Sequence, residues 1–151
     1  GQSSRGLGDV YKRQDLTNIK IKEAKGRFEI VNDSPVKIID GAHNYEGVEI
    51  LLRNYENKYG HLNTDIFLGF KKGKDINNIL NLIIGKTNYN LHLIEDDTFF
   101  DQEITKEIGY LLDKYGKNYK IASLEQFKKN KNPSILLGSL YLIGEYKKRE
   151  L

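Results

Sequence analysis

The sequence predicts an α/β fold: a three-layer, Rossmann-like sheet whose strands are mostly parallel, with one antiparallel strand at its edge. Apolar, β-branched runs of strand length alternate with segments whose apolar residues recur at the spacing of an amphipathic helix. Neighbouring parallel strands need a crossover connection, which a helix supplies. The first two runs are instead joined by the short turn sequence at 32–35, which favours an antiparallel hairpin.

Runs of strand type are bounded by polar or turn-forming residues. The predicted strands are Phe28–Val31, Val36–Ile39, Asp65–Phe70, Asn90–Ile94, Tyr119–Ala122 and Ser134–Leu137. Apolar stripes at helical spacing cover 48–59, 76–84 and 104–115, and shorter helices are predicted over Leu124–Lys129 and Leu140–Lys148. Gly60, Gly85 and Gly116 follow the three long stripes, where glycine commonly ends a helix.

The composition is that of a globular domain. The chain has 151 residues, of which 38% are hydrophobic and 30% are charged, and a chain of this length buries roughly 68–70% of its unfolded surface. No apolar run approaches the ~18 residues of a membrane helix, and no secretory leader is visible, so we expect a cytoplasmic protein. The absence of Cys excludes disulfides and thiolate chemistry.

The small excess of basic over acidic residues does not predict a nucleic-acid partner. The formal charge of +3 comes from 24 Lys and Arg against 21 Asp and Glu. Lysine (19) far exceeds arginine (5), whereas a nucleic-acid surface interleaves arginine with aromatic residues on one face. Codon bias towards Lys, Asn and Ile accounts for the composition, so we expect neither nucleic acid nor a membrane as partner.

Residues 1–25 are expected to form a disordered tail, and residues 26–151 a single domain. The run Asp9–Gln14 resembles a translated sequencing adaptor, which predicts that residues 1–14 are non-native. The sequence holds no methionine and no G-x-x-x-x-G-K-[ST] phosphate-binding loop. We therefore expect a piece of a longer protein.

Polar and glycine-bearing sequences follow several of the predicted strands. Asp40–Asn44 follows the second strand, Gly69 the third, Glu95–Thr98 the fourth, and Gly138-Ser139 the last. Ligands of open α/β sheets bind beyond the carboxyl ends of the strands, so these loops form the candidate site. Two of the loops open helices, whose N-terminal N–H groups suit a phosphate or a carboxylate.

The segments Gly26–Glu29, Ile38–Asn44 and Gly138–Glu145 resemble the C-terminal domain of folylpolyglutamate synthase and dihydrofolate synthase, in the Mur ligase superfamily. The strings D-G-A-H-N, before a predicted helix, and G-S-L-Y-L, near the end, carry the resemblance in order and spacing. It extends from roughly residue 26 to the C-terminus, and it implies a Mur ligase C-terminal type of domain.

The resemblance implies an ATP-dependent ligase that joins glutamate to folate or dihydropteroate. In that family the acceptor carboxylate is phosphorylated to an acyl phosphate, and the amine of glutamate then displaces phosphate. The P-loop, the Mg²⁺ ligands and much of the folate site lie in a larger N-terminal domain. The chain is therefore expected to work with ATP, Mg²⁺ and that domain, to hold no metal itself, and to be inactive alone.

Individual roles follow from the same resemblance. It assigns Arg27 and Asp40 to ATP binding and His43 and Ser139 to glutamate binding. Gly41, Asn44 and Gly138 are the residues of the supporting loops. Lys74-Asp75 resembles a Lys-Asp pair of the family, but the preferred interpretation of Asp75 is the N-cap of the helix that follows.

Each assigned residue also has a purely structural interpretation. Arg27 could pair with Glu29 on an edge strand, and Asp40 could cap the turn that follows it. A lone histidine is more often packed or hydrogen-bonded than a ligand. Asn44 and Ser139 suit the N-caps of the helices that they precede.

The sequence departs from the family pattern at three places, which weakens the assignment of adenine and substrate contacts there. Ala24-Lys25 stands in place of an aromatic residue, Tyr45 in place of a proline, and Asp96–Phe100 where a Pro-Arg segment is expected. The alternatives are the C-terminal domain of a cell-wall peptide ligase and a stand-alone nucleotide- or flavin-binding α/β module.

Overall fold

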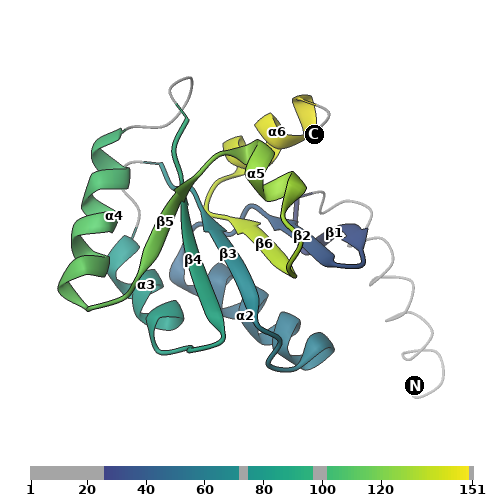
Figure 1. The fold of residues 1–151 in the computed structure, drawn as a ribbon, viewed down its shortest axis with the longest axis horizontal. Coiled ribbons are helices and arrows are strands. Elements are labelled where there is room, and N and C mark those ends of the chain that lie inside the picture. The colour runs from purple at the N-terminus through teal and green to yellow at the C-terminus, as the bar shows by residue number, and fades with distance from the viewer. Residues whose placement is uncertain (1–25, 72–74, 97–101, 150–151) are drawn as a thin grey trace, which may run out of the picture.

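The computed structural model describes residues 26–71, 75–96 and 102–149. Within them, the strands form one sheet in the order β1-β2-β6-β3-β4-β5 (Figure 1). The strands are β1 (Glu29–Asp33), β2 (Val36–Asp40), β3 (Thr64–Leu68), β4 (Tyr89–Ile94), β5 (Tyr119–Ala122) and β6 (Ser134–Leu137). Neighbouring strands are parallel except β1 and β2, which form the antiparallel edge pair. The predicted fold class is thereby confirmed.

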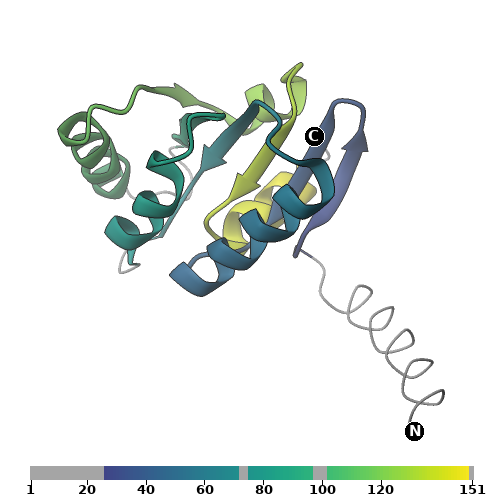
Figure 2. The same ribbon diagram turned by 90° about the horizontal axis from the view of Figure 1, so that it is seen from below.

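Helices cover both faces of the sheet. They are α2 (Tyr45–Tyr59), α3 (Ile76–Ile84), α4 (Gln102–Lys114), α5 (Leu124–Lys129) and α6 (Leu140–Lys148). The first three pack on one face and the last two on the other, which gives three layers (Figures 1 and 2). Side chains of β3 alternate accordingly, because Ile66 enters the first core and Phe67 the second.

Every predicted strand and helix is present. Five elements have the predicted ends, the ends of the others differ by at most two residues, and α2 begins three residues before its apolar stripe. The first strand begins later because Phe28 adopts a left-handed conformation (φ 44°) and donates its N–H to Asp40. The third strand ends at Leu68, and Gly69 makes the last bond of this ladder to the carbonyl of Leu137 (3.0 Å). The predicted tail at 1–25 lies outside the described residues.

The helix caps mostly follow the predictions. Asn44 accepts from the N–H of Gly47 at the start of α2 (2.8 Å), and Ser139 accepts from the N–H of Tyr141 at the start of α6 (3.1 Å). Asp75 is different, because its carboxylate accepts from the side chain of Asn78 and makes no cap bond to the backbone. Its backbone (φ −78°, ψ 63°) is not extended as an N-cap usually is.

Gly138 allows the chain to leave β6 beside β3. Its φ is +125°, and a β-carbon at this position would lie 2.3 Å from the carbonyl oxygen of Gly69. Because the obstacle is backbone, no side-chain rotation relieves it. The turn that brings Ser139 to the edge of the sheet therefore requires glycine at 138.

Replacing Gly138 with Ala should lower the free energy of unfolding by about 2–4 kcal/mol, since it adds positive-φ strain and a forced backbone shift. Urea unfolding followed by circular dichroism measures this. Gly144→Ala is the matched control, because Gly144 lies within α6 and nothing lies within 4 Å of the added carbon. The control should be neutral or stabilised by up to about 1 kcal/mol, and equal losses in both variants would contradict the interpretation.

Candidate functional site

The carboxyl edge of the sheet divides between β2 and β6. The chain leaves β2 into α2 on one face of the sheet, and it leaves β6 into α6 on the opposite face. Adjacent parallel strands whose connections diverge in this way mark the topological switch point of the sheet, where α/β folds usually bind their ligands and where we expect the binding crevice. Asp40 and Leu137 pair at the ends of the two strands, so the loops at 41–44 and 138–139 flank this crevice.

Asp40 ends β2 and is only 6% exposed. One carboxylate oxygen accepts from the N–H of Phe28 (3.0 Å), and the other accepts from the N–H of Ala42 (2.8 Å). Burial raises the pKa of Asp40, while these two bonds and the positive charge of Arg27 oppose the rise. The capping interpretation of Asp40 therefore describes the structure, and its predicted nucleotide contact would have to use the remaining lone pairs.

Arg27 lies in the turn that precedes β1, with an exposed side chain close enough to Asp40 to act on its titration. The expected partner, Glu29, instead accepts from Lys147 of α6 (2.7 Å) and from the N–H of Gly26 (3.0 Å). The guanidinium makes no hydrogen bond or ion pair with the described residues. Its forked donors are thus available to an anion.

Gly41 connects the segments of the crevice. Its N–H donates to the carbonyl of Gly26 (2.6 Å), and its own carbonyl lies 3.0 Å from Nδ1 of His43. A β-carbon at Gly41 would lie 2.3 Å from Cδ2 of Leu140, the first residue of α6. The turn before β1, the loop after β2 and the start of α6 therefore meet at one residue without a side chain.

His43 has a defined donor arrangement. Because a carbonyl only accepts, Nδ1 must carry the proton that is donated to the oxygen of Gly41. Nε2 is then an acceptor on the neutral ring and a donor on the protonated ring. His43 can therefore hold a carboxylate through Nε2 only in its protonated form.

Ser139 is 5% exposed and caps α6. Its oxygen accepts from the N–H of Tyr141, which leaves the hydroxyl hydrogen as a donor. The structure thus brings Arg27 and Asp40 together, links His43 to the same loop through Gly41, and sets Ser139 beside it through Leu140. It describes no contact between the side chains of His43 and Ser139.

Sequence reasoning missed one pair at this edge. The ammonium of Lys71, just beyond β3, lies 3.2 Å from the ring centroid of Tyr141 in α6. Tyr141 is 65% exposed although it is aromatic. The G-S-L-Y-L string contains Tyr141, but nothing local in the sequence links it to Lys71.

The described part of the chain contains no group of three or more His, Asp or Glu side chains that could hold a metal ion. Among residues 26–71, 75–96 and 102–149, no helix combines the length and apolar character needed to cross a bilayer. Lys74 and the residues at 97–100, where the sequence departs from the family pattern, lie outside the described residues.

Arg27→Ala should raise the pKa of Asp40 further, since it removes a charge that favours the carboxylate. A raised pKa means that the folded protein binds the proton more tightly than the unfolded chain. The free energy of unfolding therefore falls as the pH rises from about 4 through the pKa of Asp40. Over this range it should fall by more in the variant than in the unchanged protein. Carbon-13 titration of the carboxyl and urea unfolding between about pH 4 and 7 measure both effects. Arg53→Ala, on the exposed face of α2, is the control and should change neither.

No family model matches the chain. A curated relative, the dihydrofolate synthase/folylpolyglutamate synthase of Bacillus subtilis, is 26% identical over 130 residues. The match covers 82% of this chain and 30% of the relative. The chain therefore spans about a third of the length of this relative.

Solved structures show the same fold. Folylpolyglutamate synthase from Thermotoga maritima has a TM-score of 0.65 at 24% identity, covering 82% of this chain and 30% of that chain. The bifunctional folylpolyglutamate synthase/dihydrofolate synthase of Yersinia pestis, solved with AMPPNP and a Mn ion, has a TM-score of 0.62 at 18% identity, covering 83% and 31%. In sequence and in fold, the chain resembles the folylpolyglutamate synthases and dihydrofolate synthases, as its motifs predict.

Proposed function

We propose that this chain is the C-terminal domain of an ATP-dependent ligase that joins glutamate to folate or dihydropteroate. The observation that carries the proposal is the meeting of three motif-bearing segments at Gly41, in a chain similar to a curated dihydrofolate synthase/folylpolyglutamate synthase. That similarity favours a folate ligase over a cell-wall peptide ligase and over a stand-alone nucleotide- or flavin-binding module.

The reaction proceeds in two steps. A carboxylate oxygen of the folate attacks the γ-phosphorus of ATP, and the bond to the leaving ADP oxygen breaks. The amine nitrogen of glutamate then attacks the acyl carbon, loses a proton, and expels inorganic phosphate from a tetrahedral intermediate. Negative charge develops in the transition state of both steps, so correctly placed cations and N–H donors accelerate them.

Arg27 is assigned to the phosphates of ATP. Its side chain is exposed, permanently charged and without a hydrogen-bond partner among the described residues. The turn that carries it is fixed by the bond from Gly41 to Gly26 and by the bond from Phe28 to Asp40. A guanidinium on a rigid turn can reach a nucleotide held by a second domain, and its contact couples ATP to domain closure.

Asp40 is assigned to the same nucleotide. Each of its oxygens accepts one backbone N–H and keeps a second lone pair for a hydroxyl of the ribose. The carboxylate also holds the turn of Arg27, so its removal should disturb the ATP contacts of both residues.

His43 and Ser139 are assigned to the incoming glutamate. The protonated Nε2 of His43 and the hydroxyl of Ser139 are donors that suit its carboxylates. Asn44 and Gly138 support these loops, the first as the N-cap of α2 and the second through its backbone conformation.

The P-loop and the Mg²⁺ ligands are assigned to a separate N-terminal domain. Mg²⁺ would neutralise charge on the phosphates of ATP when it is bound there. We therefore expect the chain alone to be inactive with ATP, Mg²⁺, folate and glutamate.

A fusion tests the whole assignment. The chain replaces the segment that it matches in the Bacillus subtilis relative, and ADP release and the glutamylated product are measured. We expect turnover from the fusion and none from the chain alone. Turnover by the isolated chain, or a folded fusion that neither binds ATP nor forms product, would refute the proposal.

In the active fusion, Ser139→Ala should raise the KM for glutamate about tenfold and leave the KM for ATP unchanged, because a hydrogen bond to a charged group is worth about 1.5–3 kcal/mol. Ser123→Ala is the matched control, since Ser123 also caps a helix, α5, away from the crevice. Both variants lose a cap at a cost of about 1 kcal/mol of stability, but only the first should affect glutamate. An equal effect on glutamate in both variants would mean that capping alone is responsible.

Asp40→Ala should raise the KM for ATP instead, since it removes a nucleotide contact and frees the turn of Arg27. The same steady-state assay measures it, with Asp113→Ala on the exposed surface of α4 as control. An effect confined to glutamate would reverse the assignment of Asp40.

A further inference from the structure

The helix α6 is tied to the sheet by two ion pairs at its C-terminal end. Lys147 donates to Glu29 of β1 (2.7 Å), and Arg149 donates to Asp96, just beyond β4 (2.7 Å). In the order of the sheet, β1 lies two strands to one side of β6, and β4 lies two strands to the other. The helix that follows β6 is therefore held from both sides.

One face of α6 lies against the turn that carries Arg27. Leu140, Ile143 and Lys147 are spaced by three and four residues, so they share this face. A β-carbon at Gly26 would lie 3.4 Å from Ile143 and 3.6 Å from Leu140, which places Gly26 beside both side chains. The turn thus packs on apolar residues of α6 and is paired with a charged residue near the end of the helix.

Glu29 joins the end of α6 to this turn. Its oxygen Oε1 accepts from the ammonium of Lys147 (2.7 Å) and from the N–H of Gly26 (3.0 Å). The same carboxylate acts on Tyr146 of α6, because its negative charge adds to the larger effect of burial in raising the pKa of that phenol. Glu29 is therefore close to α6 while it holds the residue that precedes Arg27.

The pair of Lys147 and Glu29 is poorly suited to stabilising the fold. The two side chains are 38% and 35% exposed, and ion pairs this exposed usually stabilise a protein only slightly. A lysine in the last turn also interacts favourably with the helix dipole, but that effect requires no bond to Glu29. The bond fixes geometry instead, since the oxygen that accepts from Lys147 also accepts from the backbone of the turn.

We propose that Lys147 is a positioning residue of the ligase domain, which acts through Glu29 to orient the turn that presents Arg27 to the phosphates of ATP. The inference rests on the proposed function, because it requires Arg27 to bind ATP. It also makes α6 a connection between the two substrate positions. Ser139, at its N-cap, is assigned to glutamate, and Lys147, near its end, supports the ATP contact.

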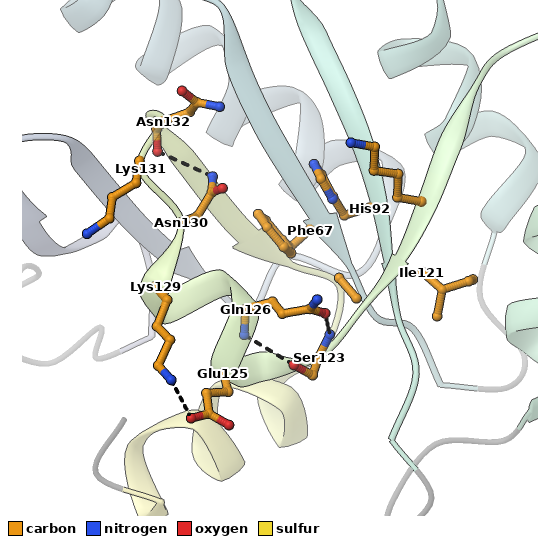
Figure 3. Close-up of a pocket in the computed structure, with 12 residues that line it drawn as sticks. Phe67, His92, Ile121, Ser123, Glu125, Gln126, Lys129, Asn130, Lys131 and Asn132 are labelled. Carbon is orange, nitrogen blue, oxygen red and sulfur yellow. Dashed lines mark hydrogen bonds and ion pairs between the residues drawn. The ribbon is translucent and has the colours of Figure 1, made fainter.

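Nuclear magnetic resonance of the full chain tests the geometry without any ligand. Lys147→Met removes the ammonium but keeps an unbranched side chain, so the amide signals of Gly26 and Arg27 should shift. Lys129→Met is the matched control, because Lys129 forms a similar pair with Glu125 on α5 (3.0 Å, Figure 3). The control should leave both signals in place. Unchanged signals in Lys147→Met, or equal shifts in the two variants, would overturn the inference and leave the proposed function standing.

The active fusion tests the effect on ATP. Lys147→Met should raise the KM for ATP about three- to fivefold, the range that a half-exposed ion pair can supply. The kcat and the KM for glutamate should stay the same, because Arg149 and the apolar face still hold α6. Lys147→Arg, which keeps the charge, should restore the KM for ATP. Lys129→Met should change none of these constants.

A double-mutant cycle in the same fusion separates positioning from a general loss of charge. Glu29→Gln keeps an oxygen that can accept from Gly26 but removes the charge that Lys147 pairs with. If Lys147 acts through Glu29, Lys147→Met should add nothing to the KM for ATP once residue 29 is uncharged. Additive effects of the two changes in an active fusion, or a rise in the KM for glutamate as large as that for ATP, would refute the positioning role.

Discussion

The close packing around Gly41 is the constraint on which the carboxyl edge of the sheet depends. One residue donates to Gly26, accepts from His43 and lies against Leu140, so segments distant in sequence meet there. A β-carbon would lie 2.3 Å from Cδ2 and 2.8 Å from Cγ of Leu140, so the side chain of Leu140 would have to move. The close approach of the loops that follow β2 and β6 therefore depends on the missing side chains at 41 and 138 as much as on the polar residues of these loops.

The sequence predicted the fold well because the signals for it are local. Apolar spacing predicted every strand and helix of the described residues, and the turn at 32–35 predicted the hairpin. Contacts between side chains that lie far apart in the sequence could not be predicted in this way. Glu29 accepts from Lys147, which lies 118 positions away, so the structural alternative in which Arg27 pairs with Glu29 does not describe the structure. Asp75 differs for a local reason, because its carboxylate accepts from the side chain of Asn78 in α3 and makes no cap bond to the backbone.

The buried hydrogen-bond network around Asp65 shows more clearly what local sequence patterns cannot predict. Asp65 lies within an apolar strand, and nothing around it in the sequence signals a buried carboxylate bound by three asparagine side chains. Two of those asparagines lie in a loop more than sixty residues further along the chain. Such a network arises only when β3, β4 and the loop before β6 are brought side by side. The motifs lie at the carboxyl ends of the strands, whereas Asp65 lies near the amino end of β3.

The polar residues of the crevice are already engaged in holding the fold, and this determines how they can meet a ligand. Asp40 supports two backbone N–H groups, and Ser139 supports one. They can therefore act only through their remaining lone pairs and hydroxyl hydrogen, at positions that the fold has fixed before any ligand arrives. Because these side chains are already ordered before the ligand binds, binding costs less conformational entropy. Arg27 is the exception, since its side chain is exposed and has no hydrogen-bond partner among the described residues. In the proposed ligase, Arg27 is consequently the group whose ordering reports that a second domain has closed.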